Sequence, residues 1–147
     1  MTESNPGAVS SVATIKEKVR PGLTGTAEAV VSEMNTAIAM GSGVVPVYAT
    51  PAMAALMEAA AVNALEGALP EDQTSVGVYL DVQHLAATPV GVAVRAEARL
   101  TAVEGRRLTF RVSAFDASEQ IGVGTHQRAI VTTDRFLDRT QTKQKGK

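Results

Sequence analysis

One long apolar stretch, residues 50–65, constrains this chain more than any other feature. It begins with Thr50 and Pro51, and it is followed by Gly67 and Pro70. A threonine can cap a helix, and proline fits the first helical turn because its missing N–H has no partner there anyway. Alanine, leucine and methionine favour the helix interior, whereas glycine and proline end it. The stretch therefore predicts a helix that Thr50 caps.

This helix is apolar on every side, and such a helix is normally buried all round. Glu58 is the exception, because it is the only charged residue between Glu33 and Glu66. An ionised carboxylate is costly in apolar surroundings unless it is paired. We therefore expect the rest of the chain to wrap the helix and to give Glu58 a partner.

Composition excludes several classes of protein. The 147 residues fit one domain, and the net charge of -1 gives no broad basic field for nucleic acid or an anionic membrane. The chain has no cysteine, and its two histidines do not have the spacing of a zinc motif, so we expect no metal site. Residues 1–11 lack the features of a secretion signal, and no apolar run is long enough to span a membrane. A cytoplasmic protein without cofactors is the expectation.

The chain divides into a core and two polar ends. Residues 1–14 and 139–147 are expected to be flexible tails, and residues 15–138 a single domain. Residues 24–32 predict a first strand. Residues 34–48 are apolar but interrupted by Gly, Ser and Pro, which indicates a loop or lid over a site.

Four segments after the helix alternate apolar and polar residues, which is typical of strands with one buried face: residues 76–83, 92–101, 108–114 and 121–131. Short turns between them predict an antiparallel meander, and Phe136 and Leu137 are expected to close the last strand. The central helix is the only long apolar element that could cover this sheet. We therefore predict an α+β fold in which a five-stranded antiparallel sheet wraps one long helix.

Three residues are candidates for chemistry: Thr50, Glu58 and His84. Counting from Val82 places His84 on the inward face at the end of its strand. Thr50 and Glu58 are roughly 80° apart around the helix and about 12 Å apart along it, so a loop or substrate must bridge them. A hydroxyl, a carboxylate and an imidazole near a helix N-terminus suit acyl transfer or hydrolysis.

Each candidate also has a purely structural interpretation. Thr50 could serve only as a helix cap, Glu58 could form a structural ion pair, and His84 could be a satisfied core histidine. His126 is expected on the outward or interface side of its strand. Spacing alone does not decide the reaction.

Several short motifs occur in a familiar order: Ala49-Thr50 with Leu56-Met57-Glu58, His84 to Gly91, Val103 to Leu108, Arg111 to Ala114, and Ile121 to Ala129. Through them, residues 16–136 resemble the hot-dog-fold acyl-CoA thioesterases, within the branch that is similar to fluoroacetyl-CoA thioesterase. The resemblance implies a long helix wrapped by five antiparallel strands. It also implies a homodimer, or a higher oligomer, with active sites at the interface.

The resemblance implies roles for five residues. Thr50 matches the catalytic threonine of the family, Glu58 its carboxylate and His84 its histidine, while Gly77 and Arg128 match positions that contact the acyl or thioester part of the substrate. The implied reaction is hydrolysis of a small or medium acyl-CoA to a carboxylate and CoA. In this division of labour Thr50 attacks the carbonyl or holds the attacking water, Glu58 helps to activate it, and His84 exchanges the proton.

The chain also departs from the branch. The fluoroacetyl-specific enzyme has phenylalanines before its threonine, whereas this chain has Val44, Val45, Val47 and Tyr48 there. Selectivity for a fluorinated acyl group is therefore not predicted. Two other hypotheses remain open: a non-catalytic module that binds acyl-CoA or another small ligand, and a hydratase or dehydratase, although no hydratase motif is found.

Overall fold

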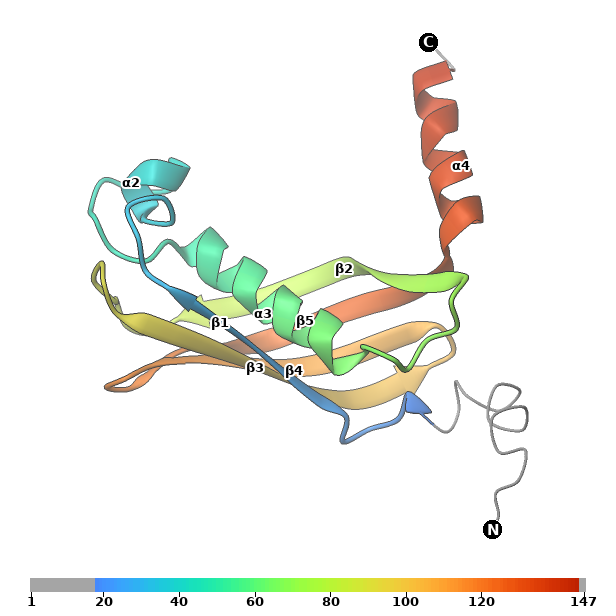
Figure 1. Cartoon of the computed structure of the whole chain (residues 1–147), viewed down its shortest axis with the longest axis horizontal. Coiled ribbons are helices and arrows are strands. Elements are labelled where there is room, and N and C mark those ends of the chain that lie inside the picture. The colour runs from blue at the N-terminus through green and yellow to red at the C-terminus, as the bar shows by residue number, and fades with distance from the viewer. Residues whose placement is uncertain (1–17, 146–147) are drawn as a thin grey trace.

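A curved antiparallel sheet holds one long helix against its concave side (Figure 1). The structure is a computed structural model, and it describes residues 18–145. The helices are α2 (Ala37–Met40), α3 (Thr50–Ala64) and α4 (Thr133–Lys145). The strands are β1 (Thr24–Val30), β2 (Gln73–His84), β3 (Ala93–Glu104), β4 (Arg107–Asp116) and β5 (Gln120–Thr132). The predicted α+β architecture of five strands and a central helix is confirmed.

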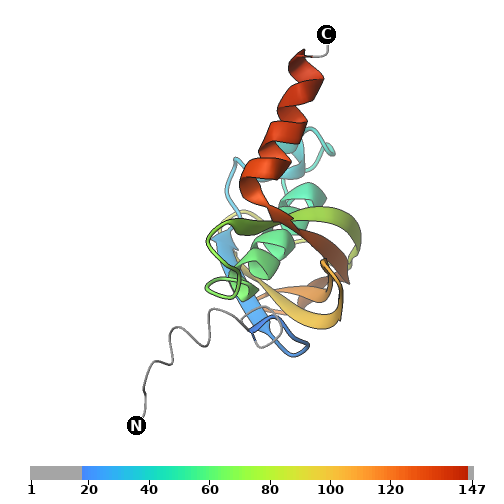
Figure 2. The ribbon, with the colours of Figure 1, turned by 90° about the vertical axis from the view of Figure 1, so that its right-hand side faces the viewer.

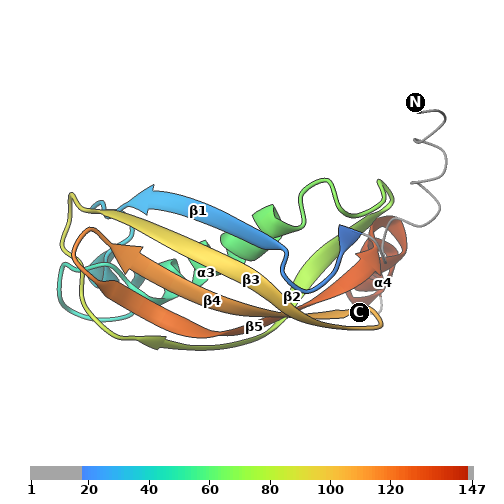
Figure 3. The ribbon, with the colours of Figure 1, turned by 90° about the horizontal axis from the view of Figure 1, so that it is seen from below.

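The sheet has the order β1-β3-β4-β5-β2, so β1 and β2 are its edges (Figure 3). Only β3, β4 and β5 form the predicted meander. The prediction of a four-strand meander is wrong for β2, because this strand pairs with β5 and not with β3. Residues 85–92 make this longer crossing possible, and Thr88 anchors it because its buried hydroxyl donates to Asp116 Oδ2 at 2.8 Å.

The core lies between α3 and the inner face of the sheet, which curves around the helix (Figure 2). Met53 and Met57 of α3 are fully buried against large side chains of the central strands, among them Leu100 and Phe110. On the other side β1 approaches closely, because Gly25 has no side chain. A β-carbon there would lie 2.4 Å from Ala60 O and 2.3 Å from Ala64 N.

The sequence predicts a helix that is buried all round, but the structure leaves one face of α3 exposed. The sheet covers one side of α3, and Ala55, Val62 and Asn63 remain exposed on the other. Val62 retains 46% of its accessible surface. One chain therefore leaves an apolar face of its central helix uncovered.

The C-terminal segment is helical, so Phe136 and Leu137 do not close the last strand. Helix α4 continues to Lys145 and projects away from the sheet (Figures 1 and 2). Asp134 in its first turn complements the helix dipole. The predicted tail over residues 1–14 lies outside the described residues.

Candidate active site

Thr50 and His84 meet at the start of the central helix. Thr50 Oγ1 lies 2.7 Å from His84 Nδ1, within hydrogen-bond distance. The prediction that Thr50 caps the helix is wrong, because Ala49 is the N-cap residue and makes no side-chain cap bond. Thr50 is the first helical residue instead, and its hydroxyl is directed to the imidazole. The hydroxyl is therefore available for chemistry.

His84 stands at the end of β2, opposite Gly122 of β5. The two-residue period predicted this inward position. Burial lowers the pKa of the imidazole below its usual value of 6.5, and the nearby backbone of Ala86 opposes this shift. The ring is therefore neutral at pH 7 and can accept a proton. Its Nε2 is buried and makes no hydrogen bond within residues 18–145.

A cavity of about 380 Å³ opens at this pair. Its walls come from the segment before α3 and from the crossing after β2, and they are mostly small or apolar: Ala37, Ser42, Gly43, Val45, Val47, Tyr48, Leu85, Ala86 and Ala87. Burial raises the pKa of Tyr48 to about 12, so its hydroxyl stays protonated. This hydroxyl donates to Ala52 O at 3.3 Å. The cavity therefore offers Thr50 an uncharged, mainly apolar environment.

The predicted lid over residues 34–48 contains the short helix α2. Thr36 caps this helix by accepting from Ala39 N, and Gly41 ends it with a φ of 71°. Several large apolar side chains of the segment are exposed, including Met34 at 85% and Val44 at 90%. An apolar segment that is exposed beside a cavity is suited to cover a ligand or to meet another chain.

The other three predicted residues form a second group further along the helix. A β-carbon on Gly77 would lie 3.4 Å from Arg128 Nη1 and 3.9 Å from Glu58 Oε1. Glu58 is half-buried, whereas Arg128 keeps only 7% of its surface. Within residues 18–145 no direct ion pair joins the two side chains. Both lie beside Gly77, where even a β-carbon would be tight because it would lie 3.2 Å from His126 Cε1.

A β-bulge brings Gly77 into this group. The register of β2 against β5 shifts between Gly77 and Tyr79. Uniform alternation would place Gly77 on the outward face if His84 points inward. The extra residue, Val78, puts both on the inner face.

Arg128 is held by Ser75 of the neighbouring strand. Its Nε donates to Ser75 Oγ at 2.7 Å, and its Nη2 donates to Ser75 O at 3.1 Å. Burial lowers the pKa of the guanidinium, and the charge of Glu58 opposes the shift. An arginine side chain is effectively always protonated in proteins, so the group remains a cation at neutral pH.

In a single chain the five predicted residues thus form two groups, Thr50 with His84 and Glu58 with Gly77 and Arg128. No hydrogen bond among the described residues joins Glu58 to Thr50 or His84. About two helical turns separate Glu58 from Thr50. The three candidate catalytic residues are therefore not assembled within one chain.

His126 is the residue whose position sequence reasoning misjudged. It is 1% exposed and lies on the inner face opposite Phe110, not on the outward side. The signal was available, because residues two apart in a strand share a face and Arg128 was already a candidate. His126 Nε2 lies 3.1 Å from Arg128 Nη1, which makes it part of the second group.

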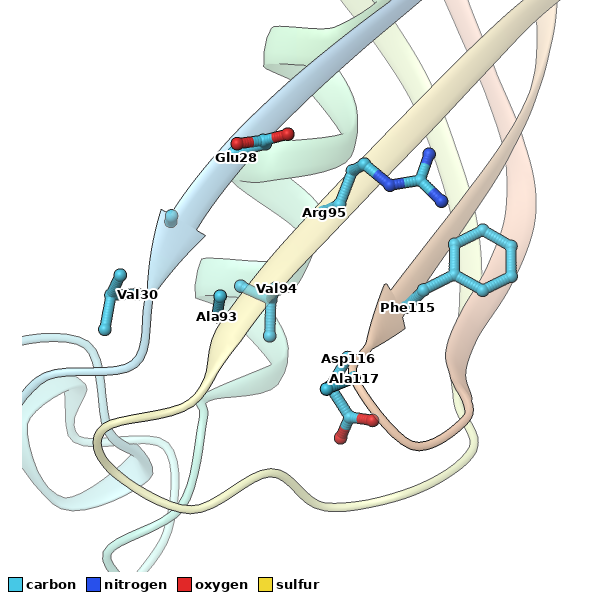
Figure 4. A pocket seen from close by; sticks show the side chains of 9 residues that line it. Glu28, Val30, Ala93, Val94, Arg95, Phe115, Asp116 and Ala117 are labelled. Atoms are coloured by element: carbon cyan, nitrogen blue, oxygen red, sulfur yellow. The ribbon is translucent and has the colours of Figure 1, made fainter.

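A further cavity, of about 440 Å³, lies on the outer face of the sheet (Figure 4). Arg95 lies over the ring of Phe115 there, 5.2 Å from its centroid, with Glu28 and Asp116 nearby. None of the five predicted site residues lines it. Among residues 18–145 no cluster of His, Cys, Asp or Glu is placed to hold a metal ion, and no helix has the length and apolarity to span a membrane.

Comparison with known proteins identifies relatives of this chain. A family model for FlK, described as fluoroacetyl-CoA-specific thioesterase, matches residues 31–134. The fluoroacetyl-CoA thioesterase of Streptantibioticus cattleyicolor is 44% identical over 97 residues, which are 66% of this chain and 70% of that protein. A solved structure of the fluoroacetyl-CoA thioesterase FlK is 38% identical and superposes with a TM-score of 0.79, covering 84% of this chain and 96% of that one.

More distant structures agree on the fold. A Thermus thermophilus protein, described as a thioesterase superfamily member, is 29% identical with a TM-score of 0.79, over 88% of this chain and 98% of that one. A hot-dog-like protein from Thermanaerovibrio acidaminovorans is 27% identical with a TM-score of 0.80, over 88% and 96% of the two chains. The resemblance, the hot-dog fold and the thioesterase class expected from the sequence are confirmed. This chain belongs to the FlK family of thioesterases.

Proposed function

We propose that this protein hydrolyses a small or medium acyl-CoA to the free carboxylate and CoA, with Thr50, Glu58 and His84 as catalytic residues. The observation that carries the proposal is the 2.7 Å contact between Thr50 Oγ1 and His84 Nδ1, two residues that line the same cavity. A thioesterase family and a relative named for acting on fluoroacetyl-CoA support the substrate class. A further relative structure is a complex with acetyl-CoA.

The chemistry follows from the neutral imidazole. His84 accepts a proton either from Thr50, which then attacks the thioester carbonyl, or from a water molecule that Thr50 holds. The carbonyl oxygen becomes an oxyanion, and the free N–H groups at the start of α3 can stabilise it together with the helix dipole. When the tetrahedral intermediate collapses, the C–S bond breaks and the imidazolium returns the proton to the leaving thiolate. In the first route a water molecule then attacks the acyl-Thr50 ester while His84 accepts its proton, and the proton returns to the Thr50 oxygen as the carboxylate leaves.

The position of Glu58 favours a site shared between two subunits. Strand β2 is an edge of the sheet, and its Val78 and Tyr79 are 45% and 48% exposed. An unpaired edge with apolar side chains is suited to pairing with another strand. The uncovered apolar face of α3 offers a second surface that a partner subunit can cover. We propose a homodimer in which Glu58 of one subunit faces the Thr50–His84 pair of the other.

The second group would hold the substrate. Arg128 beside the exposed Gly77 suits an oxygen acceptor of the acyl or thioester group, while Glu58 orients the attacking hydroxyl or water. Most of the cavity walls at Thr50 are small or aliphatic residues, and no phenylalanine or tryptophan lines them. A short aliphatic acyl chain fits this composition, and selectivity for fluoroacetyl-CoA is not part of the proposal. A cytoplasmic location remains a prediction.

A panel of acetyl-, fluoroacetyl-, butyryl- and phenylacetyl-CoA tests the function, with released thiol followed by a dye. The wild-type chain should release thiol, and Thr50→Ala, Glu58→Gln and His84→Ala should each lose most turnover while remaining folded. Thr74→Ala, on the outward face of β2, is the matched control. Binding of acyl-CoA without thiol release would favour the non-catalytic module, and consumption of an enoyl-CoA would favour the hydratase.

A further inference from the structure

His126 is a polar ring that is buried inside the sheet. It is 1% exposed, and its ring stacks on Phe110 with centroids 6.4 Å apart and an interplanar angle of 30°. Both ring nitrogens are nevertheless satisfied. Nδ1 lies 2.8 Å from Tyr79 O, and Nε2 lies 3.1 Å from Arg128 Nη1. A buried ring with two directed contacts is held in a single orientation.

The partners determine which nitrogen carries the proton. A guanidinium has only donors, so Nε2 must accept from Arg128. Nδ1 must then carry the hydrogen and donate to the carbonyl of Tyr79, next to the bulge in β2. The charged groups that face the ring are Arg128 of β5 and Glu58 of α3. Burial lowers the pKa of His126, and the charge of Arg128 lowers it further. The Tyr79 carbonyl and the charge of Glu58 raise it, but the net shift is downward.

His126 completes the set of contacts that orients Arg128. Ser75 takes one hydrogen from Nε and one from Nη2, and His126 takes one from Nη1. One hydrogen of Nη1 is left, on the atom that lies 3.4 Å from the β-carbon position of Gly77. Without His126, only the two hydrogen bonds to Ser75 would fix the orientation of the Arg128 guanidinium.

We propose that His126 is a positioning residue, which in its neutral Nδ1–H form aims the free Nη1–H of Arg128 at an acceptor oxygen of the acyl-CoA over Gly77. This inference rests on the proposed function, because it assigns Arg128 to the substrate. It adds that the His126 imidazole acts only through Arg128 and, unlike that of His84, exchanges no proton during turnover.

Two substitutions separate the two contacts of the ring. His126→Asn retains a donor near the Nδ1 position and loses the acceptor for Arg128, whereas His126→Gln retains an acceptor near the Nε2 position and loses the donor to Tyr79. We expect His126→Asn to lower kcat/KM by about tenfold or more, with His126→Gln closer to wild type. In an Arg128→Lys background the same His126→Asn change should have almost no further effect.

A stability control excludes a merely structural role. Phe110→Leu loosens the ring from its apolar side and touches neither hydrogen bond, so it should lower Tm while kcat/KM stays near wild type. Activities of the His126 variants that follow Tm alone, or a His126→Asn variant with wild-type kcat/KM, would overturn the proposal.

Nitrogen-15 NMR of the histidine side chains gives a readout that does not depend on turnover. At pH 7 the proposal requires a neutral His126 with hydrogen on Nδ1 in the wild-type protein. A protonated ring or the Nε2–H form would refute it. A wild-type protein that releases no thiol from any acyl-CoA would refute the proposed function, and the NMR spectrum would still decide how His126 meets Arg128.

Discussion

Subunit complementation is the most direct test of the shared site. The perturbation is a mixed dimer, with Thr50→Ala in one subunit and Glu58→Gln in the other. The structure places Thr50 and His84 in contact within one chain and Glu58 in a separate group. If each site takes the pair from one subunit and Glu58 from the other, one site of the mixed dimer contains both substitutions and the other contains neither.

The expected activity of the mixed dimer follows from the number of intact sites. With one intact site of two, the mixed dimer should have about half the wild-type kcat and an unchanged KM, since sites in a symmetric dimer are equivalent. Each parent homodimer has two damaged sites and should have little activity. A site contained within one chain predicts the opposite, because both sites of the mixed dimer would then be damaged.

The assay uses co-expressed subunits with two different tags, isolated as mixed dimers and followed by thiol release. Mixed dimers of Thr50→Ala with His84→Ala are the matched control, because these residues act together in one chain and neither site should recover. Wild-type subunits with the same two tags control for purification. An inactive Thr50→Ala/Glu58→Gln dimer would refute the shared site, and activity in the Thr50→Ala/His84→Ala dimer would refute the pairing within one chain.

Three further predictions concern single sites. Gly77→Ala should lower kcat/KM by about a hundredfold, because the methyl group would lie only 3.2 Å from His126 Cε1 and 3.4 Å from Arg128 Nη1, so that both side chains must shift. Gly25→Ala should lower the free energy of unfolding in urea by about 3 kcal/mol or more, since its methyl group would lie 2.3 Å from the backbone of α3, whereas Gly43→Ala meets only the Ala37 β-carbon, at 3.1 Å, and should cost less. The pKa values of His84 and His126 are lowered from 6.5, so the unfolded chain binds more protons in mildly acidic solution. Stability should therefore be fully present above pH 6.5 and fall as the pH drops through the lowered values, and kcat/KM should rise over the same range as His84 becomes neutral; a urea midpoint that increases on acidification would contradict this sign.

Local patterns in the sequence predicted much of the fold. The apolar stretch with Pro51 near its start located α3, and alternation located the strands. The same period placed His84 correctly, because it lies in the regular part of β2 beyond the bulge. These are properties of neighbouring residues, which a sequence displays directly.

Features that depend on distant residues were not predictable in this way. The pairing of β2 with β5 depends on a crossing that passes the ends of other strands, and the exposed face of α3 depends on how far the sheet curves. A threonine at the start of a helix can cap it, but the tertiary contact with His84 gives the Thr50 hydroxyl another hydrogen-bond partner. His126 was misplaced because it was judged by itself, without the inward position of Arg128 two residues away.

The bulge at Val78 has a consequence for how this family can vary in length. Gly77 and His84 are separated by an odd number of positions, yet both face the helix. Losing or gaining one residue between them would rotate one of the two groups onto the convex surface, where it would meet solvent. Tolerated insertions or deletions in this part of β2 should therefore come in pairs, and a single-residue change should remove one half of the site while leaving the sheet intact.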